Sequence, residues 1–229
     1  YAELALASFP PDVDPTRVAL AHKTIARGLE LDWPRALAAF QQALAARPDG
    51  DSPARATITA AFCSRLTMEG RFGEAVAMAE EAIEVARRVG PCAAEAEAII
   101  SLATVRGQQG MAEEAAALFA DGRAVAAACG SVHQQMRGAV NRSGILANQG
   151  AFDDAIEECN RAIAIAVDHG LDRTWGMDLR VNLLGPLVDS GRFAEALAIG
   201  MQAIPVAPAG SVRAGLMTQT GMAAVRSGD

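Results

Sequence analysis

Gly70-Arg-Phe-Gly-Glu-Ala75 is the first copy of a sequence motif that recurs along the chain. The other copies are Gly110-Met-Ala-Glu-Glu-Ala115, Gly150-Ala-Phe-Asp-Asp-Ala155 and Gly191-Arg-Phe-Ala-Glu-Ala196. Their leading glycines recur with a nearly constant period of about 40 residues, which is typical of stacked repeat proteins, in which each unit packs against its neighbours. The recurring motif therefore predicts a solenoid, whose natural role is to present a binding surface.

Each period contains two amphipathic helices. After Gly70, apolar residues recur at spacings of three and four, which predicts one apolar stripe along a helix. Gly90-Pro91 should end that helix, because glycine adopts the left-handed cap and proline cannot continue the helix. The same pattern predicts five helix pairs and one unpaired helix. We expect them at residues 15–29, 34–46, 53–69, 73–89, 93–109, 112–129, 132–149, 152–169, 173–190, 193–206 and 211–227.

The signature residues have separate physical roles. The glycine makes the tight turn between the helices of a pair, and the aromatic two residues later can wedge into the hairpin. The alanine five residues after the glycine, and another at twelve residues, allow two helix backbones to approach closely. The third copy departs from this pattern, because Ala112 replaces the aromatic and Gly122 replaces the second alanine. Since glycine inside a helix costs about 1 kcal/mol relative to alanine, we expect this unit to be the least stable of the repeats.

Composition narrows the function. The net charge of −7 disfavours direct binding of nucleic acid or of an anionic membrane surface, both of which need a basic footprint. No apolar run is long enough to cross a bilayer, so we expect a soluble protein without membrane partners. The four cysteines lack zinc-ligand spacing, which predicts buried thiols in a reducing cytoplasm. The chain has no initiating methionine and no secretory signal, so we expect a cytoplasmic piece of a longer protein.

The pattern Gly-x-Phe-x-x-Ala, followed at twelve residues by Ala, resembles the tetratricopeptide repeat (TPR). Asn141 and Asn182, nine residues before their glycines, match a common residue in the first helix of that repeat. The period near 40 is similar to the long-repeat variety of MalT-like regulators and kinesin light chains. The alanine-rich sequence of the helices is similar to the C-terminal repeats of LuxR-type ATPase regulators. This resemblance implies an all-α fold: a right-handed α-α superhelix and a sensor or protein-docking arm.

The first helix of each pair lines the concave surface in such arrays, which indicates where a partner would bind. Residues nine and thirteen before the glycines share one face, since they are one helical turn apart. That face is polar in the middle and C-terminal units. The candidate ligand-binding residues there are Glu97, Ser101, Arg137, Asn141, Asp178 and Asn182. The alternative is a solvated face on which Arg137 pairs with Asp178 or with Glu97.

No constellation of acid, base or nucleophile converges in the sequence, and no phosphate-binding loop or metal motif is present, so we expect no enzyme, no cofactor and no metal.

The first hypothesis is a non-catalytic module that binds a protein, a peptide or a small-molecule effector, as the arm of a bacterial transcriptional regulator. The alternative is a scaffold for homo- or hetero-oligomers. An uncapped apolar end would favour a homodimer, a question the sequence leaves open. We expect a single array with units at 15–50, 51–90, 91–130, 131–170, 171–210 and, in part, 211–229.

Overall fold

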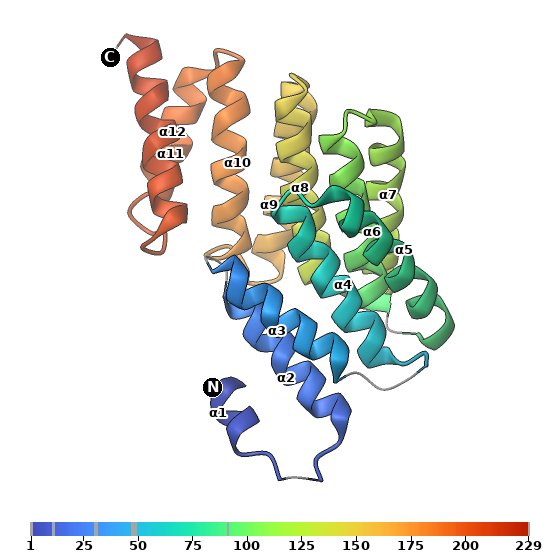
Figure 1. Cartoon of the computed structure of the whole chain (residues 1–229). Coiled ribbons are helices and arrows are strands. Elements are labelled where there is room, and N and C mark those ends of the chain that lie inside the picture. Colours follow the sequence, from blue (N-terminus) through green and yellow to red (C-terminus); the bar gives the residue numbers. More distant parts are fainter. Residues whose placement is uncertain (1, 11, 30–31, 47–49, 91, 229) are drawn as a thin grey trace. The chain divides into compact units, whose positions relative to one another are not determined.

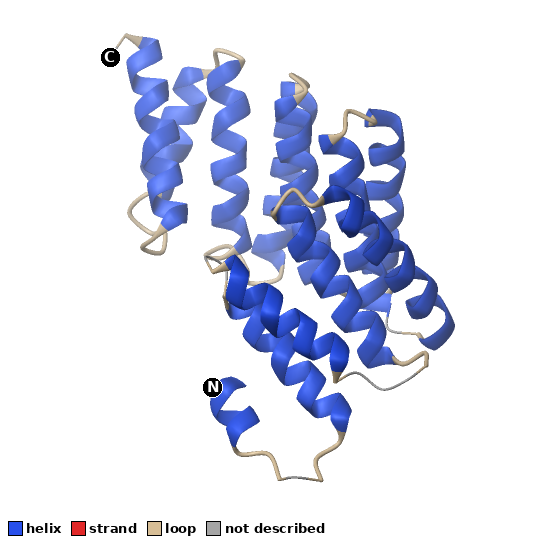
Figure 2. Ribbon diagram, viewed as in Figure 1, coloured by secondary structure: helices blue, strands red, loops and turns tan. Residues whose placement is uncertain are grey.

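The structure is a computed structural model that describes residues 2–10, 12–29, 32–46, 50–90 and 92–228. Every regular element in these ranges is a helix (Figure 2). The chain divides into two compact units: unit 1 comprises residues 1–134 and unit 2 comprises residues 135–229. Pro91, the expected stop residue, and Asp229 lie outside the described ranges.

The helices of the described ranges are labelled in Figure 1. Unit 1 contains α1 (Ala2–Ala7), α2 (Pro15–Gly28), α3 (Trp33–Ala45), α4 (Pro53–Met68), α5 (Phe72–Val89), α6 (Cys92–Gln108) and α7 (Ala112–Ala128). The helix α8 (Val132–Asn148) begins in the last residues of unit 1 and continues in unit 2. Unit 2 also contains α9 (Phe152–Asp168), α10 (Trp175–Asp189), α11 (Phe193–Ala203) and α12 (Ser211–Ser227).

Within each unit, helices that follow one another pack side by side, as the repeat period predicts; examples are α4 with α5, α6 with α7, and α9 with α10. All eleven expected helices are confirmed, with ends within three residues of the expected positions. The short helix α1 was not expected, because six residues are too few to display a helical period. We call the helix before each turn glycine a first helix (α4, α6, α8, α10) and the helix after it a second helix (α5, α7, α9, α11).

The turn glycines adopt the backbone conformation for which the sequence selects them. Gly70, Gly110, Gly150 and Gly191 have φ between 72° and 79°, a left-handed region that other residues rarely enter. The residue after each glycine donates its N–H to a carbonyl in the last turn of the first helix, as from Arg71 to Leu66 at 2.9 Å. These bonds satisfy carbonyls that the helix end would leave unpaired.

Small residues let the helices of a pair approach closely. In α5, alanines 75, 79, 82 and 86 are all buried, and the thiol of Cys63 on α4 donates to the carbonyl of Ala75 at 3.3 Å. Gly122 of the divergent third copy has a packing reason. A Cβ there would lie 2.8 Å from Cγ1 of Ile100, so the glycine makes room for a larger neighbour. Its cost in helix propensity is therefore offset by packing.

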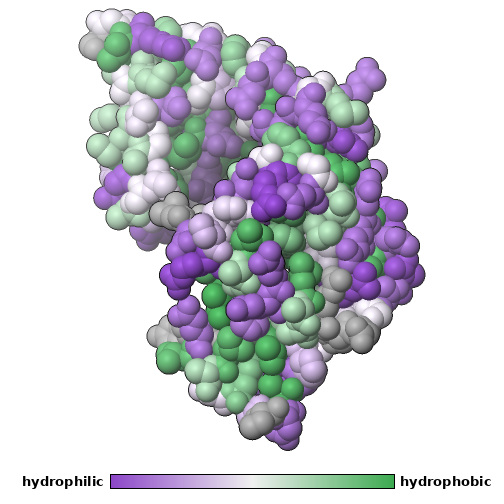
Figure 3. All heavy atoms as spheres, in the orientation of Figure 1, coloured by the Kyte–Doolittle hydropathy of each residue, from purple (hydrophilic) through white to green (hydrophobic). Residues whose placement is uncertain are grey.

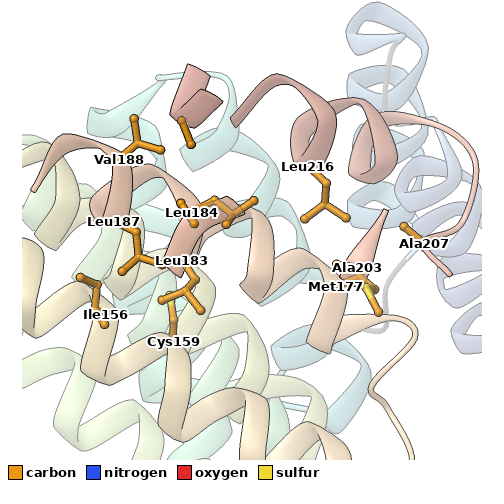
Figure 4. Packing of buried hydrophobic residues seen from close by; sticks show 12 residues of the cluster. Ile156, Cys159, Met177, Leu183, Leu184, Leu187, Val188, Ala203, Ala207 and Leu216 are labelled. Carbon is orange, nitrogen blue, oxygen red and sulfur yellow. The ribbon is translucent and has the colours of Figure 1, made fainter. Parts of the chain in front are cut away.

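Each unit has a hydrophobic core that combines large and small side chains. In unit 2, leucines from α10 and α12 lie with Ile156, Cys159 and Met177 in one cluster (Figure 4). In unit 1, alanines from α4 and α5 share their cluster with Phe40 and Phe62, whose rings lie 5.1 Å apart. Hydrophilic and hydrophobic residues are interspersed on the face shown in Figure 3, as expected when each helix buries one stripe.

Candidate functional site

The six candidate residues lie on three first helices. Glu97 and Ser101 are on α6 in unit 1. The other four are in unit 2, with Arg137 and Asn141 on α8 and Asp178 and Asn182 on α10. Glu97, Arg137 and Asp178 occupy one repeat position, and the other three residues occupy the position one turn later.

In unit 1, Glu97 is the centre of a buried polar cluster. Its side chain is only 5% exposed and forms an ion pair with Nη2 of Arg27, on α2. Nε2 of Gln134 donates to the second carboxylate oxygen at 3.4 Å. Burial lowers the pKa of nearby Lys23, the Arg27 charge lowers it further, and Glu97 opposes both effects. We call these four residues, Lys23, Arg27, Glu97 and Gln134, the Glu97 cluster.

Ser101 is also buried in unit 1. Its hydroxyl donates to the backbone carbonyl of Glu97 at 2.8 Å, the usual bond of a helical serine to the preceding turn. Sequence reasoning found Glu97 and Ser101 but missed Arg27 and Gln134. The missing signal is long-range, because Arg27 lies 70 residues and Gln134 lies 37 residues from Glu97 in the sequence.

In unit 2, Asn182 connects two first helices. Its Nδ2 donates to the carbonyl oxygen of Val140 at 2.9 Å and to the hydroxyl of Ser143 at 3.2 Å. Both partners are on α8, so the amide holds α10 against α8 with a fixed orientation. The carbonyl oxygen of the same amide thereby acquires a defined direction. Gly144 leaves space beside Asn182, because an added Cβ would still lie 4.0 Å from Nδ2.

Asp178 lies one turn before Asn182 on α10 and is half-buried. Among the described residues, none forms a hydrogen bond or an ion pair with its carboxylate. Burial raises the pKa of this carboxyl above its ordinary value, and no neighbouring charge contributes. The expected pairing of Asp178 with Arg137 is therefore absent from the described contacts. Arg137 and Asn141, on α8, are half-buried as well.

In contrast to Asp178, the buried carboxylate of Glu158 in unit 2 is paired. Glu158 on α9 accepts from Nη1 of Arg142 at 2.6 Å and also pairs with Arg161. Its side chain is 5% exposed, so the two guanidinium groups compensate the burial of its charge. Asp178 differs from both Glu97 and Glu158 in having no such partner among the described residues.

A cleft between α9, α10 and α11 has a volume of about 400 Å³. One end holds the ion pair between Asp172 and Arg180, at 2.7 Å. A Cβ at Gly176 would lie 2.8 Å from Oδ1 of Asp172, so glycine makes room for this pair. The rest of the lining consists of the amides of Asn160 and Gln202 and apolar side chains such as Ile163, Ile199 and Val206. Sequence reasoning did not identify this cleft, because its walls come from three separate helices.

The cysteines are free thiols, of which Cys63 and Cys159 are buried and Cys92 and Cys129 are half-buried. Burial raises the pKa of Cys159 to about 11, which keeps it a neutral thiol. In the described ranges, no three side chains of histidine, cysteine or acidic type gather in a way that could hold a metal ion. No described helix is long and apolar enough to span a membrane.

Comparison with known proteins identifies the fold. No protein-family model matches the chain, and no curated protein matches its sequence. A crystal structure of a putative kinesin light chain from Podosopora anserina, with nearly identical TPR-like repeats, matches with a TM-score of 0.58. The match covers 95% of this chain and 99% of that chain at 14% sequence identity, so it bears on the fold alone. It does not bear on the narrower resemblance to LuxR-type regulators. The chain has an all-α, TPR-like repeat fold.

Proposed function

We propose that the chain is a non-catalytic binding module whose ligand docks on the first-helix face of α8 and α10. Asp178 is the charged anchor, and Arg137, Asn141 and Asn182 on the same two helices complete the proposed set. The single observation that carries the proposal is the half-buried carboxylate of Asp178, which has no described partner. Burial of a charge without compensation disfavours folding, and a ligand that brings a cation or an N–H donor removes this cost.

The residues around Asp178 favour a peptide as the ligand. Asparagine side chains offer a donor and an acceptor, which matches the alternating groups of a peptide backbone. The two bonds from Asn182 to α8 orient its carbonyl oxygen in advance, which reduces the entropy lost on binding. Gly144 and Gly185 keep this face open, since no neighbour would obstruct a Cβ at either position. A lysine or arginine of the peptide would pair with Asp178.

Glu97 and Ser101 hold the equivalent positions in unit 1, where both are buried, and we propose that Glu97 acts there by holding Arg27 for a separate ligand contact. There, a ligand would reach Arg27 rather than Glu97, because the Arg27 side chain is 40% exposed and that of Glu97 only 5%.

The wider biological role is also a proposal. The resemblance of the repeats to LuxR-type regulators supports a cytoplasmic sensor arm within one continuous array. Sequencing of the complete reading frame tests this role, since a nucleotide-binding or helix-turn-helix domain in the same frame would support it. A frame without either domain would favour the alternative, a scaffold that assembles protein subunits.

A peptide-display selection tests the anchor. The wild-type chain is the bait, and the selected peptides are then titrated against Asp178→Asn, which removes the charge and keeps the shape. We expect enrichment of lysine or arginine at one peptide position and at least about tenfold weaker binding to the variant, equivalent to about 1.4 kcal/mol. Asp153→Asn is the control, because the Asp153 side chain in the same unit is 95% exposed. Equal binding to both variants and the wild type would refute the proposal.

The cleft between α9, α10 and α11 supports a second candidate function, binding of a small carboxylate effector. Arg180 uses one nitrogen for Asp172, and its planar guanidinium has further N–H donors suited to a carboxylate. The apolar walls would accept a hydrocarbon tail. Calorimetric titration with a panel of short carboxylates and apolar amino acids tests this function. Saturable binding should be lost in Arg180→Gln and kept in Arg192→Gln, and a panel without any binder would exclude the candidate.

A further inference from the structure

Lys23 is the only lysine in the chain, and every other side chain of permanent positive charge is an arginine. The distinction is chemical, because a guanidinium keeps its proton in a protein, whereas an ammonium can lose one and become a nucleophilic amine. Lys23 is therefore the one side chain in the sequence that can attack a carbonyl group as an amine. It lies on α2 and belongs to the Glu97 cluster of unit 1.

The surroundings of Lys23 differ from those of a solvated surface lysine. Its side chain is half-buried, and among the described residues none forms a hydrogen bond or an ion pair with its amine. Burial and the charge of Arg27 lower its pKa, and the charge of Glu97 opposes them only in part. A lysine that is desolvated beside another cation is an activated amine, because more of it is unprotonated near neutral pH.

Arg27 lies one helical turn after Lys23, so both side chains leave the same face of α2. Its guanidinium pairs with Glu97 on α6, and α4 packs against both α2 and α6 (Figure 1). This ion pair fixes the guanidinium, yet the Arg27 side chain remains 40% exposed and has further N–H donors. Those donors suit a carboxylate or a phosphate group that lies beside the amine of Lys23.

Gln134 supplies an unused acceptor in the same cluster. Its Nε2 donates to Glu97, but its Oε1 is buried and has no hydrogen-bond partner among the described residues. Gln134 is only 4% exposed, so solvent does not readily satisfy this oxygen. A buried acceptor without a donor destabilises the fold, and a hydroxyl or N–H of a ligand that reaches it removes this cost. The Glu97 cluster thus combines a cation for an anionic group, an amine and an acceptor.

We propose that Lys23 binds an anionic aldehyde covalently, as an imine, while Arg27 holds the anionic group. The lone pair of the unprotonated amine attacks the carbonyl carbon, and a C–N bond forms. The carbonyl oxygen then leaves as water with the two hydrogens of the amine, and a C=N double bond remains. The reaction is reversed by water and needs no oxidant or reductant. This proposal rests on the proposed ligand contact at Arg27 and not on the Asp178 anchor.

Reductive trapping with 4-carboxybenzaldehyde tests the proposal, and 4-formylbenzamide is the matched neutral aldehyde. Cyanoborohydride reduces the imine to a stable amine, and mass spectrometry of the peptides separates Lys23 from the terminal amine of the chain. The lysine introduced by Gln41→Lys, at an exposed position of α3, is an internal reference. At neutral pH, the anionic aldehyde should label Lys23 at least about tenfold faster than the reference, because the amine is activated and Arg27 concentrates the anion beside it. The neutral aldehyde should give a smaller ratio.

Arg27→Gln should reduce the ratio for the anionic aldehyde to that for the neutral one, and Arg35→Gln, at a position whose side chain is 63% exposed, should leave it unchanged. Circular dichroism checks that both variants retain their helices.

Because Arg27→Gln also removes the ion pair with Glu97, competition with excess benzoate provides a second measurement without that substitution. Benzoate should slow the labelling of Lys23 and not that of the reference lysine. Two results would overturn the proposal: labelling of Lys23 no faster than that of the reference, and a ratio that is equal for the two aldehydes and unchanged by benzoate. Either result would leave the peptide titration against Asp178→Asn unaffected, so the two proposals fail separately.

Discussion

Glu97 in unit 1 and Asp178 in unit 2 occupy the same repeat position, counted back from the turn glycines Gly110 and Gly191, yet their surroundings differ. Glu97 is buried and paired with Arg27 and Gln134. Asp178 is half-buried and has no described partner. A repeat position therefore places a side chain, whereas residues on other helices decide whether its charge stabilises the fold or is available to a ligand.

One cause of the difference is a substitution between repeats. When residues are counted back from Gly150 and Gly228, the counterpart of Gln134 is Val212, which has no side-chain donor. Asp178 therefore lacks a counterpart of the amide donor that contacts Glu97.

The largest loss of stability should come from removing the ion pair between Arg27 and Glu97. Arg27→Ala leaves the Glu97 carboxylate buried without its cation. Removal of one partner from a buried pair costs about 3–5 kcal/mol, and exposed pairs contribute well under about 1 kcal/mol. Since Arg27 is partly exposed, we expect a loss of about 2 kcal/mol in the free energy of unfolding, measured with urea. A loss no larger than that of an exposed pair would show that Glu97 does not depend on Arg27.

The second effect concerns the hydrogen bonds of Asn182, which lies one turn after the unpaired Asp178 on α10. Asn182→Ala removes two hydrogen bonds from α10 to α8 and should cost about 1 kcal/mol in a urea titration. Asn160→Ala is the control, because Asn160 is exposed on α9 and alanine is the better helix former. If both variants were equally stable, Asn182 would not be a structural tie. A loss of stability would also mean that Asp178→Asn is the cleaner test of ligand binding.

The smallest effect has the opposite sign. Asp178→Asn should raise the free energy of unfolding at neutral pH by about 0.5 kcal/mol, because it removes a partly desolvated charge that no described group compensates. Glu97→Gln, the same chemical change on the paired side, should instead lower stability. Two losses, or two gains, would contradict the comparison between Asp178 and Glu97.

The effect at Asp178 should depend on pH. Since burial raises its pKa in the folded state, the folded protein holds this proton at pH values where the unfolded chain has lost it. The resulting stability is present in full below the ordinary pKa of 3.8 and disappears as the pH rises through the raised pKa. The advantage of Asp178→Asn should therefore be near zero in acid and should reach its full size at neutral pH. Urea titrations across this range provide the measurement, and a constant difference would exclude a raised pKa.

Much of the fold could be predicted because its signals are local. The turn glycines, the alanines of the second helices and the apolar period lie within one repeat, and they placed the pairs from α2 to α12. The short helix α1 could not be predicted because it is too short to show a helical period. The packing role of Gly122 could not be predicted because it depends on Ile100 in the preceding helix.

The candidate site was only partly predictable. Counting from the turn glycines identified which residues share a face, including Asp178 and Asn182. It could not indicate that Asn182 bonds to α8 or that Glu97 pairs with Arg27, because such contacts depend on distances between helices that are far apart in the sequence. The cleft at Arg180 was missed for the same reason.

The order of residues alone set the periodicity, the turns and the residue at each repeat position, because short-range sterics and helical geometry act on neighbouring residues. Which carboxylate is paired and which glycine makes room for a neighbour became defined only when the helices packed. Those outcomes depend on what the packed helices bring within a few ångströms of a side chain, and the desolvation of charged and apolar groups is determined at that distance.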